Sequence, residues 1–150
     1  MAPIKGLKGE SLLVQIGDGA SPTEVFAHDC LINAERGIQF SADTTDDTLP
    51  DCDAPGDPGW KETLKDGLSA TVTGGGKLHT SSVADWYAWF DSDDSRNCRV
   101  KVDASAANGG GYWAGAFKLT NFEVTGERKQ YATSSVTLVS SGPVTWVDAT

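Results

Sequence analysis

The sequence predicts a mainly β domain: an antiparallel β-sandwich or partial barrel with one flanking α-helix and one long inter-strand loop. Runs rich in Thr, Ser and Val, with apolar residues at every second position, recur about eight times along the chain. Gly occurs 17 times, which is typical of tight turns between strands. Only residues 80–90 space their apolar side chains as an α-helix does. Because 150 residues suit one domain with a real core, we expect residues 1–150 to form a single domain.

Four strands are predicted before the helix, at residues 11–16, 25–28, 31–40 and 68–73. The segment 17–22 separates the first two strands, since it contains Gly, Asp, Ser and Pro. The run Gly74-Gly75-Gly76-Lys77 ends the fourth strand. It is not a phosphate-binding loop, because Leu78 stands where such a loop needs Ser or Thr to contact Mg²⁺.

Four more strands are predicted after the helix, at residues 98–103, 112–125, 131–139 and 144–147. The middle two form one long antiparallel hairpin, joined by a polar turn that begins at Gly126. The apolar positions change phase between Leu119 and Phe122, and a single-residue slip of this kind predicts a β-bulge near Asn121.

The predicted helix has one apolar face, which we expect to pack on the sheet. The residues of this face are Val83, Trp86, Tyr87 and Phe90. Ser82 and Asp85 form a Ser-x-x-Asp signal for the start of the helix. Trp89 falls off the apolar face, so it is expected to be exposed or in contact with a neighbouring subunit.

Two segments have no strand pattern. Residues 1–9, which include Pro3, Ile4 and Lys5, are predicted to form an extended N-terminal arm that orders only on docking. Residues 43–60 are predicted to form a long acidic loop, because they contain three prolines and no basic residue before Lys61. A loop of this kind stays solvated or contacts a partner, and its candidate contact residues are Asp43, Asp46, Asp47, Asp51, Asp53, Asp57 and Trp60. Trp60 is expected to anchor the return of the loop to the sheet.

The composition excludes several classes of function. The net charge of −9 argues against binding to nucleic acid through Lys and Arg, although it permits nucleic acid to pass without sticking. Three cysteines, an odd number, favour a reduced intracellular compartment during assembly. No apolar run approaches the length of a membrane span.

No motif supports catalysis or a cofactor. His28, Asp29 and Cys30 are adjacent at the end of a predicted strand, and neighbours on a strand point to opposite faces, so their side chains do not readily converge. Asp51-Cys52-Asp53 begins like a calcium loop, but Pro55 replaces the third oxygen ligand and no closing Glu follows. We therefore expect a solvated or partner-contacting loop, with calcium binding as the alternative.

Several segments, in order along the chain, resemble the major tail (tail tube) proteins of long-tailed bacteriophages, including those of phage-like gene transfer agents. The segments are Lys8-Gly9-Glu10-Ser11-Leu12-Leu13-Val14-Gln15-Ile16-Gly17-Asp18-Gly19, Pro58-Gly59-Trp60-Lys61-Glu62, Leu119-Thr120-Asn121-Phe122-Glu123-Val124-Thr125-Gly126-Glu127 and Val136-Thr137-Leu138-Val139-Ser140-Ser141-Gly142-Pro143-Val144-Thr145-Trp146. The resemblance covers nearly the whole chain, and the ordered set is more specific than any one segment.

The resemblance implies a structural virion protein with no enzymatic activity and no cofactor. It implies hexameric rings that stack into a tail tube, through which DNA is delivered without specific binding. The implied partners are other copies of the chain and tail proteins such as the tape measure and the terminator, with assembly in the bacterial host cytoplasm and no membrane. Two alternatives remain open: a tube protein of a contractile injection or type VI secretion system, and a β-sandwich carbohydrate-binding module that uses the aromatic residues of the helix.

Overall fold

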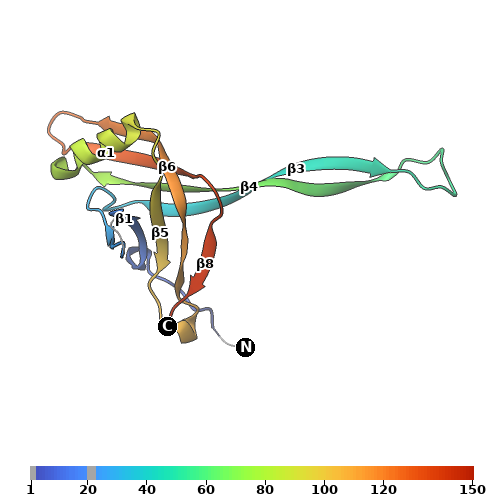
Figure 1. Ribbon diagram of the computed structural model, residues 1–150, viewed down its shortest axis with the longest axis horizontal. Helices are drawn as coiled ribbons and strands as arrows, with labels where there is room; N and C mark the ends of the chain where they lie inside the picture. The colour runs from blue at the N-terminus through green and yellow to red at the C-terminus, as the bar shows by residue number, and fades with distance from the viewer. Residues whose placement is uncertain (1–2, 20–22) are drawn as a thin grey trace.

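A computed structural model describes residues 3–19 and 23–150, and within them the chain forms one antiparallel sheet with one short helix (Figure 1). The predicted mainly β fold with a flanking helix is confirmed. The strands are β1 Leu12–Gly17, β2 Phe26–His28, β3 Arg36–Leu49, β4 Trp60–Lys77, β5 Arg96–Val102, β6 Gly111–Thr125, β7 Thr133–Ser140 and β8 Thr145–Asp148. The helix α1 spans Val83–Asp91, and 3₁₀ turns span Gly9–Ser11, Thr80–Ser82 and Ala106–Asn108. Part of the predicted turn at 17–22 lies outside the described residues.

The strands follow the order β2-β1-β5-β6-β7-β4-β3, and β8 pairs with β6 beyond the end of β7. They therefore build a single continuous sheet rather than two separate ones. The sheet curls until Arg36 at the start of β3 reaches β1, where its guanidinium Nη1 donates to the Leu12 carbonyl at 3.2 Å. No backbone ladder joins β3 to β1 among the described residues, so the sheet stays open as a partial barrel.

The core lies between the curled sheet and α1. Its buried residues are Val14, Leu31, Ile32, Ala70, Val72, Trp86, Trp89, Cys98, Val100, Phe117, Leu119, Val136 and Leu138. Most of them alternate along strands, as the period-2 patterns predicted. The bulge predicted near Asn121 is confirmed, because the pairing of β6 with β7 shifts between Leu119 and Asn121.

The segment 31–40 was expected to be one strand, and its first part is instead a turn. Asp29 stabilises this turn: its carboxylate accepts from the Leu31 amide at 2.8 Å, and its carbonyl accepts from the Ile32 amide at 3.1 Å. The turn places Leu31 and Ile32 in the core, and the strand begins only at Arg36.

The predicted apolar face of the helix is wrong in part. Trp86 and Trp89 are buried and Val83 is half-buried, whereas Tyr87 and Phe90 are 59% and 45% exposed. The buried stripe has i, i+3 spacing, and the polar atom of Trp89 has a partner, because its indole N–H donates to the Asp94 carbonyl at 3.0 Å. The two indole rings also pack together, with centroids 5.5 Å apart.

The predicted start signal of the helix does not act as a cap. Ser82 donates its hydroxyl to the Asp29 carboxylate at 2.9 Å, and it makes no side-chain capping bond. Asp85 pairs instead with Arg96 at 3.2 Å. In the part of the chain that the structure describes, no helix has the length and apolar character needed to cross a bilayer.

Candidate assembly surface

The most prominent feature of the molecule is a two-stranded ribbon that projects from its body (Figure 1). It consists of the distal parts of β3 and β4, which pair from Phe40 with Ala70 outward to Leu49 with Trp60. β7 pairs only with residues 71–77 of β4, so the ribbon has no third strand. At about 3.3 Å per residue, the nine steps from Phe40 to Leu49 extend roughly 30 Å.

The ribbon corrects the prediction of a long loop at 43–60. Asp43, Asp46 and Asp47 lie in β3, and only residues 50–59 form a loop. The prolines are confined to that short tip, while the Thr-rich segment before it pairs with residues 60–65 of β4. Trp60 does not anchor a return to the body: it is 91% exposed at the far end of the ribbon.

Most of the net negative charge of the protein is on this ribbon and its tip. Residues 43–66 carry eight acidic and two basic side chains, so their net charge is −6 and that of the rest of the chain is −3. None of the ion pairs in the described structure involves a ribbon residue. An elongated, uncompensated acidic surface of this kind favours a basic partner.

One face of the ribbon combines apolar and acidic side chains, and we call it the Trp60 face. The cross-strand pairs on it are Leu49 with Trp60, Asp47 with Glu62 and Thr45 with Leu64. Leu49 and Leu64 are 52% and 64% exposed. Asp47 and Glu62 place two like charges directly opposite each other, which destabilises an isolated ribbon. This face therefore has two adjacent carboxylates without a cationic partner among the described residues, bordered by exposed apolar side chains.

The tip of the ribbon is stabilised by its own backbone. Asp51 accepts from the Asp53 amide through its carboxylate at 2.9 Å and from the Ala54 amide through its carbonyl at 3.2 Å. The Asp57 amide donates to the Ala54 carbonyl at 3.1 Å. Among the described residues, no group of three or more His, Cys, Asp or Glu side chains could hold a metal ion.

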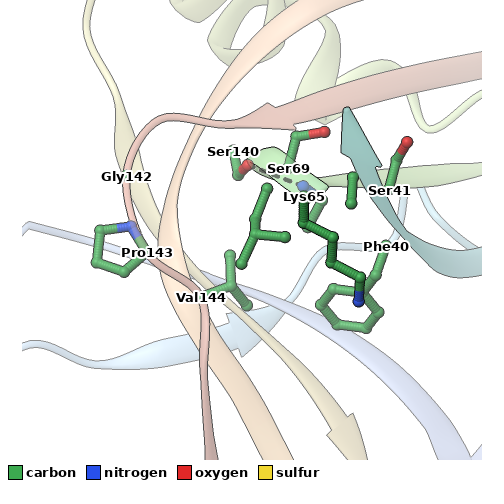
Figure 2. A pocket seen from close by; sticks show the side chains of 11 residues that line it. Phe40, Ser41, Lys65, Ser69, Ser140, Gly142, Pro143 and Val144 are labelled. Atoms are coloured by element: carbon green, nitrogen blue, oxygen red, sulfur yellow. Dashed lines mark hydrogen bonds between the residues drawn. The ribbon is translucent and has the colours of Figure 1, made fainter. Parts of the chain in front are cut away.

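A pocket of about 440 Å³ lies where the ribbon joins the body (Figure 2). Phe40, Lys65 and Leu68 of the ribbon line it on one side, and Pro143 and Val144 from the connection between β7 and β8 line it on the other. The Ser140 hydroxyl accepts from the Ala70 amide at 2.9 Å and joins the two sides. The pocket is thus a second exposed apolar surface next to the ribbon.

The N-terminal arm is extended and exposed from Pro3 to Lys8, while Met1 and Ala2 lie outside the described residues. Ile4 is 94% exposed, and Lys5 reaches only the Ala107 carbonyl at 3.3 Å. The structure therefore does not bring the arm, the ribbon and the helix residues Val83, Trp86, Tyr87 and Phe90 together into one site. The first two are exposed surfaces at different places, and the helix contributes chiefly to the core.

The titratable groups form no catalytic arrangement in the described part of the chain. His28 hydrogen-bonds the Val14 carbonyl through Nδ1 at 3.0 Å, and burial raises the pKa of the Cys98 thiol to about 12, so this thiol stays protonated. Trp86 and Trp89, which a sugar-stacking platform would need at the surface, are buried.

The chain resembles known proteins over most of its length. The family model described as phage tail tube protein matches residues 7–146. No curated protein matches the chain.

Among solved structures, the fold is similar to a chain in the tail of an empty gene transfer agent (GTA) particle with C6 symmetry, at 20% identity and a TM-score of 0.73, covering 95% of this chain and 99% of that one. It is also similar to a chain in the virion of a native GTA particle, at 20% identity and a TM-score of 0.71 with the same coverage. The SPP1 tail tube shares the fold at 12% identity and a TM-score of 0.62, covering 95% of this chain and 80% of that one. The match of the family model over nearly the whole chain shows that this protein belongs to the phage tail tube protein family.

Proposed function

We propose that six copies of this structural protein form a ring, and that the rings stack into a tail tube through which DNA is delivered. The observation that carries the proposal is the projecting ribbon. Residues 43–67 include no buried residue, and large apolar side chains stand exposed on the ribbon, which is an unfavourable arrangement for an isolated chain. Contacts with other copies would cover this surface. The C6 symmetry of the similar GTA tail supports the number six.

The open sheet supports the same proposal. β2 and β3 are its two edges, and β3 leaves its outer edge unpaired along a strand of 14 residues. Joining the sheets of neighbouring copies would satisfy these backbone groups, since closure into a barrel removes edges.

The acidic side chains of the ribbon and its tip are proposed to contact neighbouring subunits or rings. The N-terminal arm, with Pro3, Ile4 and Lys5, is proposed to reach an adjacent subunit, which would cover the exposed Ile4 side chain. Both elements stand away from the core, and the arm would become ordered on contact.

The net charge of −9 supports a channel that DNA crosses without specific binding, because a wall that does not attract phosphate lets DNA slide. Tail proteins such as the tape measure and the terminator are proposed as further partners. Assembly is proposed to take place in the cytoplasm of the bacterial host, without a membrane step.

Electron microscopy of the purified protein at high concentration tests the proposal. Rings or tubes with sixfold symmetry are expected. A single monomeric species in sedimentation velocity runs at every concentration and salt condition, with no rings in the microscope, would contradict it.

A further inference from the structure

The turn between β6 and β7 has an unusual backbone position. The Gln130 amide donates to the Glu127 carbonyl at 3.2 Å and closes a four-residue turn. Its third residue, Lys129, has φ of +67°, and no other residue besides glycine has a positive φ in the described part of the chain. Glycine is favoured at such a position, because a side chain there costs about 1–2 kcal/mol. The chain thus has a lysine at a position where the backbone conformation favours glycine.

The turn and the adjacent end of β4 carry three basic side chains and one acidic side chain, Glu127, so this part of the surface is basic on balance. Arg128 precedes Lys129, and Lys77 lies nearby with its ammonium 5.5 Å from the centroid of the Tyr131 ring. Tyr131 is 81% exposed. None of the three cations takes part in an ion pair within the described structure. We call Lys77, Arg128, Lys129 and Tyr131 the basic turn.

The basic turn and the Trp60 face lie at opposite ends of the molecule. In Figure 1 the connection between β6 and β7 lies beside α1, whereas the ribbon extends away from the body in the other direction. The two surfaces cannot meet within one chain. They can meet between two copies in a head-to-tail contact, which continues into a ring or a stack because each copy keeps one free surface of each kind.

We propose that the basic turn of one copy docks on the Trp60 face of a second copy. Lys129 and Arg128 lie against the Asp47–Glu62 pair and relieve its repulsion, while Tyr131 packs against the apolar border formed by Trp60 and Leu64. The chemistry of the two surfaces matches in both respects: cations beside an aromatic ring on one, and carboxylates beside apolar side chains on the other. The inference rests on the proposed function and names the partner surface of the ribbon.

Substitution of Lys129 separates this role from folding. Lys129→Gly and Lys129→Asn remove the charge and suit a positive φ, so both variants are expected to melt no lower than the parent protein. Their critical concentration for assembly, measured by sedimentation, is expected to rise at least about tenfold, which corresponds to about 1.4 kcal/mol. Lys129→Arg keeps the charge and is expected to assemble as the parent does. Equal assembly by the Gly, Asn and Arg variants would overturn the inference.

Charge reversal identifies the partner surface. Asp47→Lys with Glu62→Lys, and Arg128→Glu with Lys129→Glu, are each expected to stop assembly when present alone. The chain that carries all four substitutions, and an equal mixture of the two double variants, are expected to assemble again, because opposite charges then face each other in every contact. If the two double variants fail and neither the fourfold variant nor the mixture is restored, the basic turn is not the partner of this face. If the parent protein itself forms no rings or tubes, the proposed function fails rather than this inference.

Discussion

Removal of the ribbon should separate folding from assembly. The perturbation replaces residues 43–67 by Asn-Gly, which joins Ala42 to Leu68, two residues that already face each other across the hairpin. None of the excised residues is buried, and β4 keeps its pairing with β7 at residues 71–77. Because an isolated two-stranded hairpin is marginally stable in water, the ribbon adds little to the stability of the body.

The expected magnitudes follow from the structure. The melting temperature of the excised protein should stay within about 3 °C of the parent's, which corresponds to roughly 1 kcal/mol for a chain of this size. The net charge should change from −9 to −3, since the excised residues carry eight acidic and two basic side chains. Assembly into tubes should be lost.

The assay combines thermal melting by circular dichroism with sedimentation and electron microscopy. A matched control removes only the tip, joining Leu49 to Trp60 through Asn-Gly. Because it retains the Trp60 face and loses only the contacts of the tip, it should still assemble, but more weakly than the parent protein. Tubes of normal length from the excised protein would refute the role of the ribbon. A fall in melting temperature of more than about 10 °C would refute its independence from the body.

Three further predictions concern the body. Trp89→Ala should destabilise the fold by about 3–5 kcal/mol, because Trp89 is 2% exposed and its indole N–H is hydrogen-bonded. Phe90→Ala should cost only about 1 kcal/mol. Denaturant unfolding measures both costs, and similar values would contradict the observed buried face of the helix. Burial raises the pKa of the Cys98 thiol from 9.0 to about 12, so the unfolded chain loses this proton at a lower pH than the folded chain does. The free energy of unfolding should therefore fall as the pH rises from about 9 towards 12, and Cys98→Ala should abolish this effect. Gly75→Ala should destabilise the fold by about 1–3 kcal/mol, because the added Cβ would lie 2.7 Å from the Ser134 carbonyl oxygen. Gly126→Ala is the control: its Cβ would have no neighbour closer than 3.9 Å, so the melting temperature should stay unchanged.

The sequence predicted the strands that have one buried face and one polar face. In β5, Cys98 and Val100 alternate with Arg99 and Lys101, and the structure buries the first pair. The bulge near Asn121 was predictable for the same reason, because one extra residue in a strand moves every later apolar side chain to the other parity of the period-2 pattern.

The ribbon was not predictable from alternation, because neither of its faces is buried in the single chain. Its Asp and Pro content indicated a loop, and the signal that was missed is the β-forming run Thr44, Thr45, Thr48 and Leu49 opposite the run that begins at Trp60. The helix face was missed because nine residues give too few turns to separate i, i+3 from i, i+4 spacing. The basic turn depends on φ of Lys129, which no residue pattern indicates.

The unpaired outer edge of β3 has a consequence for the timing of polymerisation. Unpaired strand edges can pair with other chains and so promote aggregation. Asp43, Asp46 and Asp47 lie along this edge and repel the same strand of another copy, so free chains resist zipping together. Free chains therefore resist pairing through these edges before they assemble, and added salt, which screens the charges, should increase the aggregation of unassembled chains.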